Sequence, residues 1–390
     1  MANKWILGGI PMHNDLARVH ARKIGQGELP EILAGIPFNN LTPILVETMR
    51  CKSEQIAPQE LMQEAEMKSE FFGPSSISQK ELCHFQQLYF QIMPVYFESI
   101  QLPPIVPFGI CTALTKLGQN ERLTTIRKSE VISDSTLALS VQAAIRRKQQ
   151  RISPEGVYQN VSMATFHRLL RLQKFDIEKC WSQHFEILGT ITTGRCQGKN
   201  SFRNETVRSH LQMWIDFFNL LNKSGYNYRN ILFTFSFVPL IEWILEEYNV
   251  CREEVTQNSL KSGYDFFELY HIPFPRQISS VYEIQHFLSG KTKAESIYKQ
   301  LLKFEEEVLE PLRQFNPNIR FCYEMDRKLG LGYFNGICFH GYATNFSGVC
   351  FDLIDGGTSD WVGQMLSDKH EVTVTSSFGV EVGIAQFRQR

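Results

Sequence analysis

The last sixty or so residues constrain the fold most, because three short glycine-punctuated segments follow one another there. They are Leu329 to Phe339 (LGLGYFNGICF), Asp355 to Asp360 (DGGTSD) and Phe378 to Val382 (FGVEV). Each segment combines strand-forming residues with glycines, which suit points where a backbone turns or closely approaches a neighbour. This pattern predicts the floor of a pocket in an antiparallel sheet. None of the three segments contains an arginine.

The rest of the chain alternates helical and strand-like segments. Apolar residues recur at helical spacing from Gln79 to about Glu98, where Pro94 is expected to end or kink the helix. Ser133 to Thr136 is typical of a helix N-cap. Further helices are expected at about 204–222, 236–248 and 294–315, and strands at 182–189, 319–325 and 331–382. This order predicts an α+β domain built on an antiparallel sheet flanked by helices.

Gly73 to Ser76 (GPSS) divides the chain into two unequal parts. We expect residues 1–76 to form an N-terminal extension, whose role the sequence does not reveal. Residues 77–390 are expected to form the main domain, with a mainly helical insertion at about 200–316.

Charge and cysteine content exclude several classes of protein. The net charge of −1 gives no overall field for nucleic acid or an anionic membrane. The nine cysteines are an odd number and form no Cys-x-x-Cys motif, which indicates a reducing, cytoplasmic setting. No apolar run has the length of a membrane span. The ten histidines show no His-x-x-x-His spacing, so no metal site is expected.

Taken in order, these segments resemble the catalytic core of histidyl-tRNA synthetase, a class II aminoacyl-tRNA synthetase. Ser99 to Pro103 resembles the strand of class II motif 1, which implies a homodimer. Asp134 and Thr136 resemble the acid and hydroxyl that hold the substrate amino group in this family. A carboxylate suits that task because an ammonium carries a full charge and three donors. From the residues alone, the same pair could equally cap a helix.

The resemblance also implies an amino-acid pocket further along the chain. Its residues would come from motif 2, from a Tyr-Tyr pair and from a Gly-Gly pair of the family. In this sequence they fall on Gln183 and Glu186, Tyr333 and Phe334, and Gly356 and Gly357. Gly379 to Val382 falls on motif 3 and supplies Glu381.

The departures from the family are systematic and lie on its nucleotide side. The motif 2 arginine is replaced by a misplaced His167 or Arg168, and the motif 3 arginine by Val382. The histidine-specific arginine falls on Leu329, with Arg327 expected two positions away on the same strand face. Losing three charge-assisted hydrogen bonds would forfeit roughly 4 to 9 kcal/mol. The resemblance therefore does not imply ordinary adenylation.

Three hypotheses follow. The first is a regulatory subunit of ATP phosphoribosyltransferase, which would sense histidine or a related amino acid and pair with the short catalytic subunit. The second is an ATP-dependent, amino-acid-activating ligase with an unusual acceptor, in which Arg168, Arg171, Arg327 and Glu381 would bind nucleotide together with Mg²⁺. The third is a pseudoenzyme scaffold. Because the chain ends about a dozen residues after motif 3, we expect no anticodon-binding domain and no tRNA binding.

Overall fold

The computed structural model describes residues 13–115, 122–153, 159–173, 182–196, 201–259, 261, 263–328 and 330–389. Within these residues, nine strands form one sheet in the order β1-β4-β5-β11-β10-β9-β6-β8-β7. The β1–β4 and β6–β8 pairs are parallel and the other pairs are antiparallel. The strands are β1 (Glu98–Ser99), β4 (Val161–Leu170), β5 (His184–Arg195), β6 (Arg229–Phe237), β7 (Gln277–Ile278), β8 (Arg320–Glu324), β9 (Ile337–Thr344), β10 (Cys350–Ser359) and β11 (Glu371–Gly379). A separate hairpin pairs β2 (Ile105–Pro107) with β3 (Ser129–Val131).

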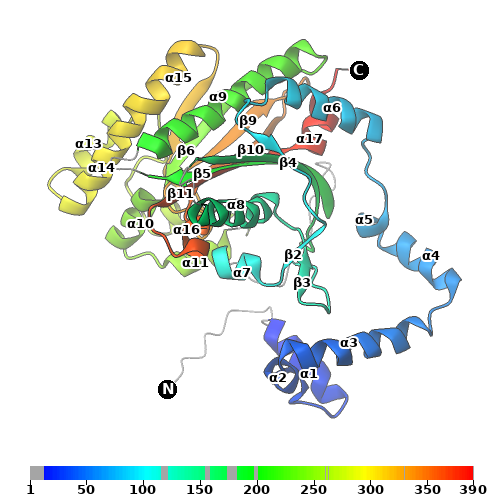
Figure 1. The fold of residues 1–390 in the computed structure, drawn as a ribbon. Helices are drawn as coiled ribbons and strands as arrows, with labels where there is room; N and C mark the ends of the chain where they lie inside the picture. Colours follow the sequence, from blue (N-terminus) through cyan, green and yellow to red (C-terminus); the bar gives the residue numbers. More distant parts are fainter. Residues whose placement is uncertain are drawn as a thin grey trace.

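Helices cover both faces of the sheet (Figure 1). The front face is defined here as the one under α7 (Ile110–Thr115), α8 (Ser135–Ile152) and α16 (Trp361–Leu366). The back face lies under α6 (Gln79–Ile92), α9 (Ser201–Lys223) and α17 (Val380–Phe387). This arrangement confirms the expected α+β architecture with a large sheet flanked by helices.

The remaining helices lie beside the sheet or before it in the chain. Those after β6 are α10 (Val238–Glu247), α11 (Arg252–Asn258), α12 (Phe266–Leu269), the 3₁₀ turn Val281–Ile284, α13 (Gln285–Leu288), α14 (Thr292–Phe304), the π-helical turn Glu305–Leu309 and α15 (Glu310–Phe315). Those at the N-terminus are α1 (His13–Lys23), α2 (Leu29–Gly35), α3 (Phe38–Ser53), α4 (Pro58–Met67) and α5 (Ser69–Phe72). No helix in the described part of the chain is long and apolar enough to cross a membrane.

The helix that starts at Gln79 ends at Ile92, two residues before Pro94, as expected. Two other segments differ from the expectations. The C-terminal segment 331–382 contains α16 and the start of α17, as well as strands. Segment 200–316 is mainly helical, but its strand β6 lies inside the sheet between β9 and β8. This segment therefore contributes to the sheet rather than being only an insertion beside it.

Strand alternation decides which side chains meet on each face. Gly189 of β5 faces the front, because a Cβ there would lie 2.4 Å from Ser135 Oγ on α8. Glu186, three residues earlier, faces the back and accepts a hydrogen bond from Gln86 of α6. The back face is packed with aromatic rings, for example Trp214 and Phe378 at a centroid distance of 6.0 Å.

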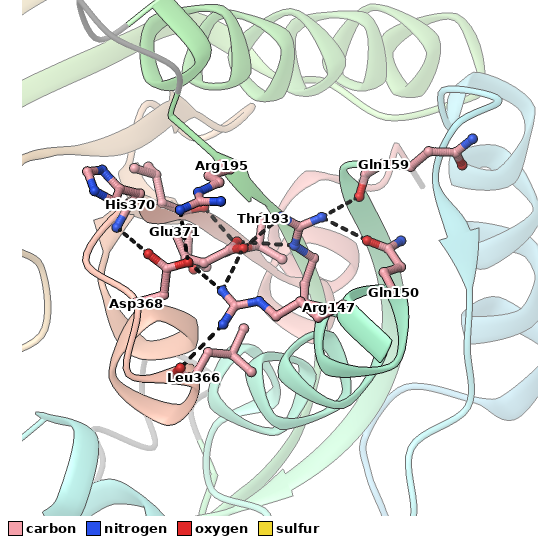
Figure 2. A network of polar contacts seen from close by, with 12 residues as sticks. Arg147, Gln150, Gln159, Thr193, Arg195, Leu366, Asp368, His370 and Glu371 are labelled. Atoms are coloured by element: carbon pink, nitrogen blue, oxygen red, sulfur yellow. Dashed lines mark hydrogen bonds and ion pairs between the residues drawn. The ribbon is translucent and has the colours of Figure 1, made fainter. Parts of the chain in front are cut away.

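A buried ion pair fixes α8 to the front face (Figure 2). Arg147 on α8 donates to both carboxylate oxygens of Glu371 on β11, at 3.1 and 2.7 Å, and both side chains are almost fully buried. Arg147 also donates to the carbonyl of Gln159, and Arg151 pairs with Glu371 and Asp368. Such a pair tolerates burial only because several hydrogen bonds satisfy both charges. It therefore holds α8, whose N-terminus forms part of the candidate site, in one position on the sheet.

The N-terminal helices extend away from the sheet (Figure 1). Helices α2, α3, α4 and α5 contain no buried residues. Phe38 of this segment contacts the hairpin region: its ring meets Phe108 at a centroid distance of 5.5 Å and lies 5.5 Å from Lys128 Nζ. At its far end, the side chain of Ser75 bonds Glu381 on α17 at 2.8 Å. Ile77 then packs in the main core.

Candidate functional site

The N-terminus of α8 brings three predicted residues together on the front face. Asp134 is the N-cap of α8, and its Oδ1 accepts from the amides of Thr136 and Leu137 at 2.9 and 3.3 Å and from Thr136 Oγ1 at 2.7 Å. Its Oδ2 accepts from the hydroxyl of Tyr333 at 2.6 Å, and that hydroxyl lies 2.6 Å from Thr136 Oγ1. Asp134 therefore caps the helix with one oxygen and faces Tyr333 with the other.

Tyr333 is held within an aromatic wall. Its ring meets Trp361 edge to face at 4.5 Å and Phe334 at 4.8 Å. A turn at Gly330, which has a positive φ of 79°, accepts from the amides of both Tyr333 and Phe334 at 2.9 Å. Burial raises the pKa of the Tyr333 hydroxyl well above its usual range, and the nearby Asp134 raises it further. The hydroxyl thus stays protonated at neutral pH and donates to Asp134.

A second polar group stands on the neighbouring strands of the same face. Asp355 lies opposite Ser377 in the β10–β11 register, and Ser377 lies opposite Gly189 in the β11–β5 register. Directly opposed residues share a face, so Asp355 and its partner His340 on β9 also point to the front. Asp355 Oδ1 accepts from Arg327 Nη2 at 2.9 Å and lies 3.3 Å from His340 Nε2.

The charged groups around Asp355 shift one another's pKa values. Although the Asp355 side chain is partly exposed, the surrounding protein acts to raise the pKa of its carboxyl, and the guanidinium of Arg327 and the His340 ring lower it to about 2. Burial and Arg327 act to lower the pKa of His340, whereas the carboxylates of Asp355 and Asp352 raise it above its usual value. His340 Nδ1 also lies 2.8 Å from the hydroxyl of Tyr342. The carboxyl group of Asp355 is therefore ionised at neutral pH.

The two predicted glycines are required by close packing. A Cβ on Gly356 would lie 2.4 Å from the ring of Phe339, and a Cβ on Gly357 would lie 2.8 Å from the ring of Phe334. Because Gly357 has no side chain, the ring of Phe334 can pack against it. The guanidinium carbon of Arg327 lies 5.7 Å from the Phe334 ring centroid. Gly357 thus shapes the site indirectly, by placing Phe334.

Arg168, Glu186 and Glu381 gather on the back face, away from Asp134 and Tyr333. Arg168 donates to Glu381 at 2.5 Å, and its other amino group lies 2.9 Å from His184 Nδ1. Glu186 bonds Gln86 at 2.7 Å, and burial raises its pKa. The structure therefore separates Glu186 from the amino-acid-side residues with which the resemblance grouped it.

Gln183 and Arg171 are held by backbone carbonyls beside α8. Arg171 donates through Nε to the carbonyl of Ser133 at 2.8 Å, and its guanidinium carbon lies 5.4 Å from the Phe185 ring centroid. The side-chain amide of Gln183 donates to the carbonyl of Gln173 at 3.4 Å. The side-chain oxygen of Gln183 is buried without a hydrogen-bond partner in the described part of the chain. This oxygen marks Gln183 as a candidate for contact with a ligand.

Arg327 lies beyond the end of β8, outside the strand on which it was expected. Leu329, the residue aligned with the family arginine, lies outside the described residues. The guanidinium of Arg327 is buried against Asp355 and Phe334. It therefore supports the pocket floor, and its charge is shared with a carboxylate.

A cavity of about 470 Å³ borders the aromatic wall. Tyr333, Phe334 and Trp361 line it together with polar residues of α11 such as Arg252. In this region Arg252 pairs with Glu242 at 2.5 Å and bonds the carbonyl of Leu331. Tyr333 therefore both bonds Asp134 and lines this cavity.

Sequence reasoning missed Asp355 and His340 as site residues. Asp355 begins one of the glycine segments, and His340 directly follows another. The available signal was alternation: each is an ionisable residue between apolar neighbours in a predicted strand. Only the strand register shows that the two are opposite each other.

Comparison with known proteins agrees with this architecture. No protein-family model matches the chain, and no curated protein matches it. Among solved structures, an ATP phosphoribosyltransferase regulatory subunit/histidyl-tRNA synthetase from Bacillus halodurans is similar, with a TM-score of 0.59, 11% identity and 80% of each chain covered. A histidine–tRNA ligase subunit from Alicyclobacillus acidocaldarius has a TM-score of 0.58 and 12% identity, with 80% of this chain and 95% of that chain covered.

A histidyl-tRNA synthetase from Nostoc is also similar, with a TM-score of 0.53 and 14% identity. The match covers 80% of this chain and 73% of that one. At these identities the likeness concerns the fold. The chain thus has a histidyl-tRNA synthetase-like class II catalytic-core fold.

Proposed function

We propose that this chain binds an amino acid on the front face of its sheet and acts as a cytoplasmic regulatory subunit of ATP phosphoribosyltransferase, without charging tRNA. The observation that carries this proposal is the contrast between the two sides of the site. The amino-acid side is assembled as one hydrogen-bonded group of Asp134, Thr136 and Tyr333. The cations proposed for phosphate binding are engaged by protein groups instead.

Each of those cations has a partner in the structure. Arg168 pairs with Glu381 on the back face, Arg171 bonds a backbone carbonyl, and Arg327 pairs with Asp355. A guanidinium that is already hydrogen-bonded would have to exchange that partner for phosphate, which removes most of the gain. The aligned His167 is half-buried, and burial lowers its pKa, so it is neutral at pH 7. This arrangement favours ligand sensing over adenylate formation.

The ligand's ammonium would lie against the half-buried carboxylate of Asp134. Its three donors match the carboxylate and the two hydroxyls of Thr136 and Tyr333. Among the similar solved structures, one carries the name of an ATP phosphoribosyltransferase regulatory subunit, which supports the assignment to that complex. Regulation would then arise from a difference in amino-acid affinity between two states of the complex.

We further propose a homodimer formed along the β1 edge of the sheet, as the motif 1 resemblance implies. Exposed apolar side chains stand just before this edge strand, with Val95 fully exposed and Tyr96 54% exposed. Apolar residues exposed together at a sheet edge favour association. Light scattering at micromolar concentration should give the mass of two chains. A monodisperse monomer would contradict the proposed dimer.

Calorimetric titration with histidine tests amino-acid binding. An Asp134→Asn variant keeps a good N-cap residue but removes the charge, so α8 should persist while histidine binds about 10- to 150-fold more weakly. Asp265→Asn is the matched control, because Asp265 caps α12 and is not among the residues that surround Tyr333. It should leave binding unchanged. Failure of histidine and all other amino acids to bind, or amino-acid-dependent pyrophosphate exchange into ATP, would overturn the proposal.

A further inference from the structure

Asp355 has an asymmetric ion pair that a purely structural role does not require. Its partner Arg327 is buried, with 2% of the side chain exposed, whereas 48% of the Asp355 side chain is exposed. In the structural pair Arg147–Glu371, by contrast, both side chains are almost fully buried. The Arg327–Asp355 pair therefore holds a carboxylate at a solvent-accessible position, with a buried guanidinium as its partner.

Arg327 and His340 lie against the same oxygen of Asp355. Arg327 Nη2 donates to Oδ1 at 2.9 Å, and His340 Nε2 lies 3.3 Å from that same Oδ1. Within the described part of the chain, Oδ2 of this carboxylate makes no hydrogen bond, whereas Oδ1 accepts one from Arg327. One oxygen is thus fixed and the other remains available to accept hydrogen bonds, which is the geometry of a pre-oriented recognition group.

Contacts connect this carboxylate to the Asp134 cluster. The guanidinium that holds Asp355 packs on the ring of Phe334, Phe334 packs on Tyr333 at 4.8 Å, and Tyr333 bonds Asp134. The charge of Asp355 also contributes to the raised pKa of Tyr333, after burial and Asp134. Asp134 and Asp355 are therefore linked on one face of the sheet through Tyr333, Phe334 and Arg327.

We propose that Asp355 is the residue that selects the ligand's side chain. With the α-ammonium at Asp134, Oδ2 of Asp355 would accept a hydrogen bond from a nitrogen donor on that side chain. The ligand class is then an α-amino acid with an imidazole, guanidinium or ammonium group. This inference rests on the proposed amino-acid binding.

Electrostatics favour this class of ligand over neutral side chains. The one buried cation of this group, Arg327, is already paired, and a second carboxylate, Asp352, lies 3.7 Å from His340. A ligand with an added positive charge or N–H donor would complete the bonding of Asp355. An aliphatic side chain would cover its free oxygen without replacing the lost water, which is unfavourable.

Titration of the full chain with histidine, arginine, lysine and leucine tests the inference. At least one of the three nitrogen-bearing amino acids should bind more than about tenfold more tightly than leucine, because a charge-assisted hydrogen bond contributes to them alone. Asp355→Asn should weaken binding of the preferred amino acid about 10- to 150-fold and leave leucine unchanged. Asp265→Asn, which removes a carboxylate that caps α12 outside this group, is the control and should change the preferred affinity less than threefold.

The outcomes separate the two proposals. If leucine binds as tightly as the other three, or if Asp355→Asn keeps the wild-type preference, side-chain selection by Asp355 is wrong while amino-acid binding stands. If no amino acid binds the wild-type chain, both proposals fail. The wild-type preference needs no variant, so the test remains decisive even if a substitution at Asp355 impairs folding.

Discussion

Removing the carboxylate of Glu371 should destabilise the domain strongly. Glu371→Gln keeps the shape of the side chain but leaves the guanidinium of Arg147 buried without its counter-charge. Both groups are almost fully buried, and two hydrogen bonds of 2.7 and 3.1 Å join them (Figure 2). Breaking such a pair from one side costs about 3 to 5 kcal/mol.

The contacts that remain in Glu371→Gln indicate how large the loss of stability should be. In Glu371→Gln, Arg147 would keep its hydrogen bonds to the Gln159 carbonyl and to the Gln150 side chain, which are both neutral groups. Arg151 would lose one of its two carboxylate partners. These hydrogen bonds do not neutralise the charge of Arg147, so we expect Glu371→Gln to lower the free energy of unfolding by about 3 kcal/mol or more. The double variant Arg147→Met, Glu371→Leu removes both charges and should cost less than Glu371→Gln alone.

Urea denaturation followed by circular dichroism measures these differences, with the slope of the transition compared among the variants. A double-mutant cycle built from Arg147→Met, Glu371→Leu and the double variant then isolates the coupling between the two side chains. The reasoning would be refuted by a cost below about 1 kcal/mol for Glu371→Gln, or by single-variant costs that simply add in the double variant.

Three further predictions concern other parts of the fold. Gly189→Ala should lower the free energy of unfolding by about 1 to 3 kcal/mol, because the added Cβ would lie 2.4 Å from Ser135 Oγ. Adding Ser135→Ala to the same chain should restore part of the lost stability. An unchanged urea midpoint for Gly189→Ala would count against this packing. Burial lowers the pKa of His210 to about 3, so below about pH 6.5 the unfolded chain binds a proton at this residue that the native state does not. This residue alone should therefore lower the free energy of unfolding by about 2 kcal/mol between pH 7.5 and 5.0. A His210→Asn variant should flatten that part of the stability profile, and an unchanged profile would show that the ring titrates in the native state. Deleting residues 1–72 should leave the urea midpoint unchanged, since α2 to α5 contain no buried residues, whereas a large drop would reveal contacts essential to the core.

Local patterns were sufficient to predict much of the architecture. The N-cap at Asp134 and the end of α6 before Pro94 depend on neighbouring residues, so the sequence itself specifies them. The glycines Gly356 and Gly357 do stand in a strand where neighbouring side chains approach closely. These features follow from backbone chemistry within a few residues.

Long-range pairing explains the differences. Arg168 and Glu186 look like site residues in a linear comparison, but their strand register points both to the back face, where Arg168 meets Glu381 of α17. Asp355 and His340 are 15 positions apart in the sequence and become neighbours only through the β9–β10 register. Periodicity gives the alternation of a strand but leaves open which face is which.

Reconstitution with a short-form ATP phosphoribosyltransferase catalytic subunit tests the proposed regulatory role. We expect this chain to change the rate of phosphoribosyl transfer, histidine or the preferred amino acid to alter that effect, and Asp134→Asn to remove the response to the amino acid. A catalytic rate that is the same with and without this chain, at concentrations where both proteins are folded, would contradict it.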